Sequence, residues 1–339
     1  MKNKTLFGSK FDIFIVAEIG MTHNGDFDLA IKLTDAAIKS GANVIKYQWH
    51  IAEEETTKDA PSPPYFKDES RYEYFKRTEF SKLQFRKLVQ LCKDKEVIPC
   101  SSVFSNQSVL NAQEVGFEII KIPSGEISNI PLLRTVNKTK LPTILSSGMS
   151  NWGDLDLAVN QFEERSRICI LQCTSLYPTP ADKVGLNIIP EIYQRFNTIT
   201  GLSDHTLTSA TSIAAIVMGA KVIEKHFTTS KELYGPDAKF SLDPLEFQDM
   251  VADIKFIHAS YLNPVNKNNL EDFTEMKKVF EKSIVAKNSI AKGELLSLKN
   301  ISFKKPGNGI SASRVDEIIG KRCTKDLIKD EQINFDFLK

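Results

Sequence analysis

The chain has 339 residues, more than one hydrophobic core usually holds, so we expect a large domain and a small second unit. Its 44 basic and 43 acidic residues give a formal net charge of +1, which excludes a sequence-wide attraction to nucleic acid or to an anionic membrane. No apolar stretch of the sequence approaches the roughly 20 residues that a membrane span needs.

The cysteines and the amino terminus indicate the compartment. The five cysteines are odd in number and show no C-x-x-C spacing, which argues against a disulfide framework and against a structural zinc site. The amino terminus lacks the apolar core of a signal peptide. We therefore expect reduced thiols in a cytoplasmic enzyme.

Eight apolar runs of strand length recur along the chain, and most of them end at polar or ionisable residues. They are 14–17 before Glu18, 43–45 before Lys46, 97–100 before Ser101 and Ser102, 118–120 before Lys121, 142–145 before Ser146 and Ser147, 168–171 before Gln172, 199–205 ending at His205, and 222–226 ending at His226. Helical periods lie between them, at 29–38, 82–93, 109–114, 155–162 and 210–218. This alternation predicts a (β/α)₈ TIM barrel over residues 1–262, with its site at the carboxyl ends of the strands.

The composition changes after the predicted barrel. A polar stretch begins at residue 263, and a charged helical passage follows it, so we assign 263–282 as a linker. Residues 283–339 form short alternating or apolar runs separated by Gly, Pro and Asn. They predict a small, mostly β domain that is near the lower size limit for folding alone. We therefore expect this domain to pack against a partner.

His205 and His226 fall at the same rim of the predicted barrel, because parallel strands point their carboxyl ends the same way. Two imidazoles there could hold a divalent metal. Alternatively they cap their strands through backbone hydrogen bonds, which is the favoured interpretation for the two residues alone. The recurrence of polar residues at the other strand ends favours a site. Without thiolate ligands, the expected ion is Mn²⁺ or Mg²⁺.

Lysines and carboxylates share this rim. Lys46, Lys121 and Lys225, with Ser147 and Ser203, would form an anion site suited to a phosphorylated carboxylate. Lysines at strand ends can also be solvated, and for Lys225 this alternative carries equal weight because side chains alternate across a strand.

Two carboxylates, Glu18 and Glu126, belong to the same set of strand-end residues. A carboxylate beside a metal or a bound water can act as a general acid or base. Either one could instead be the structural partner of a lysine.

In seven motifs that occur in order, the chain resembles the sialic acid synthase family. The motifs lie at 18–25, 45–48, 121–126, 145–149, 173–180, 201–206 and 224–228. The segment 305–310 is similar to that family's antifreeze-like (SAF) domain. The His23-Asn24-Gly25 motif resembles sialic and legionaminic acid synthases rather than pseudaminic acid synthases.

The resemblance implies a transferase that condenses phosphoenolpyruvate with an N-acetylated hexose, either N-acetylmannosamine or a 2,4-diacetamido-6-deoxy hexose. The products would be a nine-carbon 2-keto acid of the sialic acid type and phosphate. C3 of phosphoenolpyruvate attacks the aldehyde carbon, water adds at C2, and phosphate leaves by C–O cleavage. A divalent metal, Mn²⁺ first with Mg²⁺ or Co²⁺ as alternatives, would polarise the aldehyde.

The resemblance also implies a role for particular residues. Those implied to hold phosphoenolpyruvate are Lys46, Ser102, Lys121, Ser147, Ser175 and Ser203. Those implied to contact the sugar are Glu18, Gln48, Tyr177 and Asp237. Glu126 would activate the water, and His205 and His226 would bind the metal.

The family further implies a homodimer in which the SAF domain covers the partner's site. Lys305 stands where the family commonly has an arginine that reaches into that site, and lysine keeps the charge but loses the planar fork. The segment 51–80 has no clear counterpart in the family pattern, and we expect it to shape the sugar pocket.

Two rival functions remain open from the sequence. One is another phosphoenolpyruvate-dependent sugar synthase or an aldolase on the same barrel; an aldolase would need a Schiff-base lysine. The other is a noncatalytic carbohydrate-binding protein, against which Glu126, His205 and His226 argue.

Overall fold

The computed structural model describes residues 6–62 and 68–339. The chain divides into two compact units, Met1–Asn263 and Pro264–Lys339. In the described part of the chain, no helix is both long enough and apolar enough to cross a membrane.

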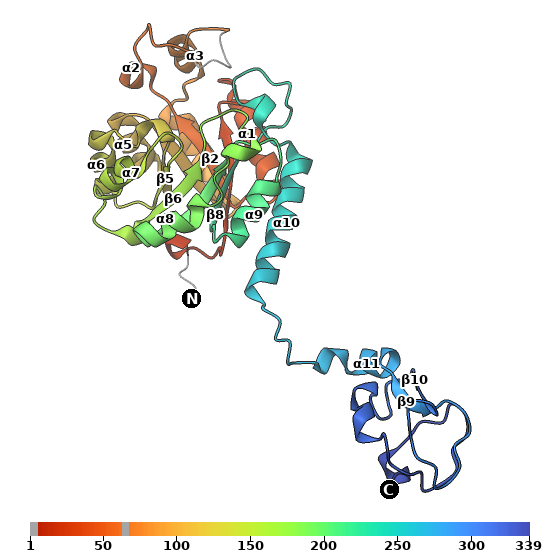
Figure 1. Cartoon of the computed structure of the whole chain (residues 1–339). Coiled ribbons are helices and arrows are strands. Elements are labelled where there is room, and N and C mark those ends of the chain that lie inside the picture. Colours follow the sequence, from red (N-terminus) through yellow and green to blue (C-terminus); the bar gives the residue numbers. More distant parts are fainter. Residues whose placement is uncertain (1–5, 63–67) are drawn as a thin grey trace. The chain divides into compact units, whose positions relative to one another are not determined.

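The first unit is a closed barrel of eight parallel strands in the order β1 to β8, which confirms the predicted fold class (Figure 1). Its strands are β1 (Phe14–Gly20), β2 (Val44–Trp49), β3 (Ile98–Val103), β4 (Ile119–Ile122), β5 (Thr143–Ser146), β6 (Ile168–Cys173), β7 (Ile199–Asp204) and β8 (Val222–His226). The barrel closes where β1 pairs with β8, in a register that sets Glu18 beside His226. On its other side Glu18 lies beside Lys46 of β2.

Helices surround the strands. They are α1 (Phe27–Lys39), α4 (Lys82–Asp94), α5 (Asn106–Val115), α6 (Ile130–Thr139), α7 (Trp152–Val159), α8 (Ile188–Phe196), α9 (Ala210–Val217) and α10 (Pro244–Leu262). Several begin at the caps that their sequences specify: at α4, for example, Ser81 and Gln84 form a reciprocal capping box. The apolar faces of the helices pack on the outer faces of the strands in one large core.

A smaller core fills the inside of the barrel. It is built from inward side chains of the strands, namely Phe14, Val16, Val44, Cys100, Ile119, Ile144, Cys169, Leu171 and Val222. Side chains alternate across a strand, so the residues that follow these in steps of two also point inward, at the carboxyl end. The apolar layers therefore form a floor, and the polar layer above it is the candidate site.

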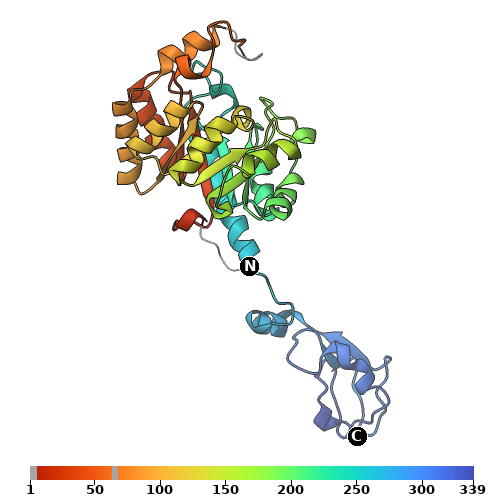
Figure 2. The same ribbon diagram turned by 90° about the vertical axis from the view of Figure 1, so that its left-hand side faces the viewer.

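Two short helices, α2 (Ala52–Glu55) and α3 (Arg71–Thr78), follow β2. They lie together at one end of the barrel, and both views show the segment projecting from that end (Figures 1 and 2). Because Arg71, Tyr74 and Phe75 of α3 line the same cavity as the strand-end residues, this is the carboxyl end of the strands.

The second unit has its own core, centred on Ile284, Ile290, Ile301 and Ile318. Strands β9 (Ser283–Ala286) and β10 (Ile301–Lys304) pair antiparallel, and single bridges connect several other segments. The unit also includes helix α11 (Thr274–Phe280) in the segment predicted as a linker. This is the small β-rich domain that the sequence predicts.

Candidate active site at the carboxyl end of the barrel

A cavity of about 290 Å³ opens at the carboxyl ends of the strands. Ten of the predicted site residues line it: Glu18, Lys46, Gln48, Ser102, Lys121, Tyr177, Ser203, His205, His226 and Asp237. They come from strands or loops spread over the whole barrel, and closure of the sheet brings them together. The period-two pattern explains the strand residues, since Lys46 and Gln48 continue the inward series of Val44.

Glu224 is the central charged residue that the sequence reasoning missed. Its carboxylate lies 2.9 Å from Lys46 Nζ and 2.6 Å from Lys121 Nζ, and it accepts a hydrogen bond of 2.9 Å from Ser203 Oγ. The strand period would have identified it, because Glu224 stands two residues before the inward His226. Glu224 therefore holds the two lysine ammonium groups at the floor of the cavity.

The charged groups in this cluster shift one another's pKa values. Burial disfavours the ionised form of Glu224, but Lys121 and Lys46 outweigh burial and hold its pKa below the usual range. Burial likewise opposes the charge on Lys46, yet Glu18 and Glu224 raise its pKa. Burial raises the pKa of Glu18 to about 7, with Lys46 acting against it. A carboxyl with such a pKa can exchange a proton near neutral pH.

Lys225 lies outside the cavity. Its ammonium is 3.1 Å from Asp204 Oδ2, and both side chains are fully buried on the outer side of the strands. It also donates to the carbonyl oxygens of Thr206 and Thr208, at 2.6 and 2.9 Å. The anion-site role considered for Lys225 is therefore wrong, because adjacent residues of one strand point to opposite faces.

The two histidines lie side by side, with ring centroids 5.5 Å apart. Nδ1 of His205 donates a hydrogen bond of 2.9 Å to the carbonyl oxygen of Thr174. Nε2 of the same ring is then the acceptor atom, and it lies 3.2 Å from the Tyr177 hydroxyl. Nδ1 of His226 is buried and has no hydrogen-bond partner in the described part of the chain.

These two imidazoles fit a metal site. An unpaired buried ring nitrogen is costly unless a ligand satisfies it, and a backbone contact on the far nitrogen is how metal-binding histidines are commonly oriented. Among residues 6–62 and 68–339, no group of three or more His, Cys, Asp or Glu side chains is arranged to hold a metal. A metal here would thus take two protein ligands and fill its remaining positions from water and substrate.

Besides Lys225, three predicted residues of the barrel are absent from the lining of the cavity. The carboxylate of Glu126 follows β4 and accepts a hydrogen bond of 2.7 Å from Asn129 Nδ2, and burial raises its pKa. Ser147 donates to the carbonyl oxygen of Leu171 at 3.0 Å, while its neighbour Ser146 lines the cavity instead. Ser175 is also absent from the lining, although its hydroxyl lies near the Ser124 hydroxyl and the Cys173 thiol, which belong to lining residues.

The position of Ser175 depends on a glycine. A Cβ added to Gly148 would clash with the hydroxyls of Ser175 and Ser124 and with the thiol of Cys173. Because Gly148 lacks a side chain, these three groups converge at one point, and its backbone N–H donates to Ser124 Oγ at 3.0 Å. Ser124 and Cys173 line the cavity and were missed as site residues.

Aromatic and cationic groups of the segment 51–80 also line the cavity. Arg71, Tyr74 and Phe75 come from α3, and His50 stands at the end of β2 next to them. The Arg71 guanidinium lies over the Phe75 ring, 5.3 Å from its centroid. The segment that we expected to shape the pocket therefore contributes part of its wall.

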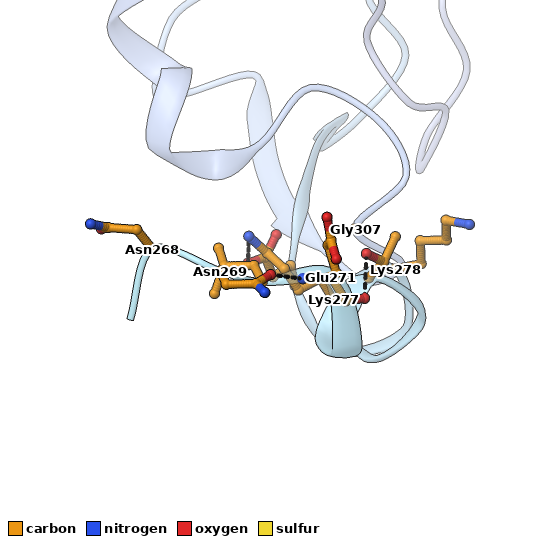
Figure 3. A pocket seen from close by; sticks show the side chains of 9 residues that line it. Asn268, Asn269, Glu271, Lys277, Lys278 and Gly307 are labelled. Carbon is orange, nitrogen blue, oxygen red and sulfur yellow. Dashed lines mark hydrogen bonds and ion pairs between the residues drawn. The ribbon is translucent and has the colours of Figure 1, made fainter. Parts of the chain in front are cut away.

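Lys305 belongs to the second unit. Its ammonium lies over the Phe280 ring of α11, 4.8 Å from the centroid. The next turn packs on the same helix, where Gly307 N–H donates to the Lys278 carbonyl oxygen at 2.7 Å. Figure 3 shows this region, a shallow cavity lined by Lys277, Lys278 and Gly307 together with Asn268, Asn269 and Glu271.

A closed (β/α)₈ barrel with lysines, carboxylates and two histidines gathered at its carboxyl rim defines a barrel enzyme. The NeuB family model matches residues 33–282, and the SAF domain model matches residues 281–339. The chain therefore belongs to the NeuB family of sialic and legionaminic acid synthases, and it ends in a SAF domain.

Individual relatives agree. The N,N'-diacetyllegionaminic acid synthase of Campylobacter jejuni is 37% identical over 94% of this chain and 98% of its own length. The human N-acetylneuraminate-9-phosphate synthase is 30% identical over 96% of this chain and 92% of its own. Among solved structures, the spore coat polysaccharide biosynthesis protein SpsE of Bacillus subtilis matches with a TM-score of 0.66 and 30% identity, over 98% of this chain and 97% of that one.

Proposed function

We propose that this enzyme condenses phosphoenolpyruvate with an N-acetylated hexose to give a nine-carbon 2-keto acid and phosphate. The supporting observation is one cavity that holds two buried lysines, a carboxyl with a pKa near 7 and two histidines. The hexose we favour is the 2,4-diacetamido-6-deoxy sugar, because two relatives named N,N'-diacetyllegionaminic acid synthase stand among the most similar proteins. N-acetylmannosamine is the alternative.

In this mechanism, Lys46 and Lys121 bind the carboxylate and phosphate of phosphoenolpyruvate, with hydroxyl donors from Ser102, Ser203 and Ser124. Both ammonium groups are already paired with Glu224, so the lysines are held in place before substrate arrives. Glu18, Gln48, Tyr177 and Asp237, which line the same cavity, contact the sugar.

The reaction then joins C3 of phosphoenolpyruvate to the aldehyde carbon, and one water adds at C2. The resulting intermediate breaks its C–O bond and releases phosphate. Glu126, which lies beside the lining of the cavity and whose pKa burial raises, is the residue we propose to take the proton from that water. His205 and His226 would hold a divalent ion, for which Mn²⁺ is our first choice. Such an ion, when bound, would act as a Lewis acid toward a carbonyl oxygen.

We further propose that the enzyme works as a homodimer in which Lys305 of one subunit completes the sugar site of the other. A small domain gains stability from burial against a partner. The chemistry supports a cation at this position, since sugar hydroxyls and amide oxygens accept hydrogen bonds from an ammonium.

The decisive experiment uses phosphoenolpyruvate carrying ¹⁸O at the bridging oxygen, together with each hexose in turn. The proposal predicts a nine-carbon product by mass and recovery of the label in the released phosphate. Absence of product with both sugars rejects the proposed substrates. Borohydride trapping of a substrate–enzyme adduct would instead indicate an aldolase.

A further inference from the structure

His50 is a buried histidine that the reaction as proposed above does not use. It directly follows β2, is 4% exposed, and lines the cavity. Its ring is stacked between Phe75 of α3, 3.9 Å away at an interplanar angle of 11°, and Phe104, 4.2 Å away at 18°. The imidazole plane is therefore fixed from both faces.

Both ring nitrogens of His50 face oxygen acceptors. Nδ1 lies 2.6 Å from Glu55 Oε1, and Nε2 lies 2.8 Å from Gln48 Oε1. The amide oxygen of Gln48 only accepts, so Nε2 of His50 donates to it, while Nδ1 faces the Glu55 carboxyl group.

The amide of Gln48 is oriented by this contact. Its oxygen receives the hydrogen bond from His50, and its nitrogen donates to Glu18 Oε1 at 2.7 Å. Rotating the amide by half a turn would set N–H against N–H at His50 and oxygen against oxygen at Glu18. The Nε2–H of His50 thus selects one of two otherwise similar orientations.

The orientation matters for Glu18. With Oε1 satisfied by Gln48, the second oxygen, Oε2, is buried and makes an ion pair of 3.2 Å with Lys46, but it accepts no hydrogen bond within the described residues. That oxygen is left to accept a hydroxyl group. We propose that His50 is a positioning residue for the sugar: it holds the Gln48 amide so that Glu18 keeps an acceptor free for a hydroxyl of the acetamido hexose.

This inference rests on the proposed function, and its test separates the two. Removing His50 alone would leave the buried Glu55 side chain without its hydrogen-bond partner, so the reference protein is Glu55→Gln. In that background, His50→Leu removes the donor to Gln48. By contrast, His50→Gln can donate to Gln48 while accepting from the amide that replaces the Glu55 carboxylate. The two variants fill similar volumes and differ in hydrogen bonding.

We expect His50→Leu to raise the KM for the acetamido hexose roughly tenfold, the order expected for one lost hydrogen bond to a charged network. The KM for phosphoenolpyruvate should stay unchanged, and His50→Gln should restore the sugar KM to near the reference value. Melting temperatures measured in parallel report folding.

A purely structural role would change both KM values together or neither. Equal sugar KM values in the Leu and Gln variants, with all proteins folded, would overturn the inference while leaving the proposed function intact. A parent protein that turns over no acetamido hexose would overturn both.

Discussion

Glu224 and Lys121 form a buried ion pair of 2.6 Å between strands β8 and β4, on opposite sides of the barrel. Lys46 joins the same carboxylate at 2.9 Å. These three groups therefore keep one uncompensated positive charge at the floor of the site before any anion binds. An anionic substrate that displaces or shares these contacts meets ammonium groups that are already held in position, which reduces the reorganisation that binding requires.

The lysine pair gives the first prediction. Lys46→Ala and Lys121→Ala should each raise the KM for phosphoenolpyruvate far more than the KM for the sugar, since each removes a charged donor worth roughly 1.5 to 3 kcal/mol. Steady-state kinetics with each substrate varied in turn measures this. The surface variant Lys183→Ala serves as control. Unchanged KM values for phosphoenolpyruvate in both variants would reject the anion site.

The second prediction concerns the histidines. His205→Ala and His226→Ala should each weaken Mn²⁺ binding, measured by equilibrium dialysis on the folded protein, and abolish the activity that EDTA removes and Mn²⁺ restores. Each variant would lose one of the two protein ligands that we propose for the ion. His258→Ala, on α10 away from the cavity, should bind Mn²⁺ as the parent does. Normal metal binding in both active-site variants would refute the assignment.

The third prediction separates Lys225 from the active-site lysines. Lys225→Met should lower the free energy of unfolding by roughly 3 to 5 kcal/mol, because it leaves the buried Asp204 carboxylate without its cation. The double variant Asp204→Asn/Lys225→Met should recover much of this loss. Denaturant unfolding provides the measurement, and a Lys225→Met protein as stable as the parent would contradict the buried pair.

The fourth prediction is a pH shift. Burial raises the pKa of Glu126, and the Arg71 charge acts against this rise. If Glu126 must be ionised to take a proton, activity falls as the pH drops through its raised pKa. Arg71→Gln removes the opposing charge, so the pKa should rise further and the acid limb of kcat should move to higher pH.

Lys76→Gln is the matched control for this shift. It removes one positive charge from the same helix, but its ammonium pairs with Glu53 at 3.0 Å. Its pH profile should match that of the parent. An acid limb that moves to lower pH in Arg71→Gln, or that does not move, would exclude Glu126 as the group that sets it.

The fifth prediction tests the dimer. Mixing an inactive Glu126→Ala protein with an inactive Lys305→Ala protein should restore activity, because one of the two sites in a heterodimer then keeps both residues. Each variant mixed with itself is the control. Two outcomes would show that Lys305 does not act across subunits. One is full activity of Lys305→Ala alone, and the other is an inactive mixture in which heterodimers are detected by mass.

The sequence alone was enough to predict the barrel and much of its polar rim. Strand length, the period of two, and the recurrence of polar residues at strand ends depend on local geometry, which is why Lys46, Lys121, His205 and His226 were found. The same period, applied strictly, would have replaced Ser147 by Ser146 and Lys225 by Glu224. The assignment of Lys225 came from reading strand ends without following which face each residue takes.

Tertiary structure decided what each inward residue touches. Lys121 and Glu224 are 103 residues apart in the chain, and only closure of the barrel makes them partners. The stacking of His50 depends on where α3 folds back over the cavity, and no periodicity in the sequence encodes that placement. A strand's period determines the face of a side chain, whereas its partner across the barrel is determined by the packing of the whole unit.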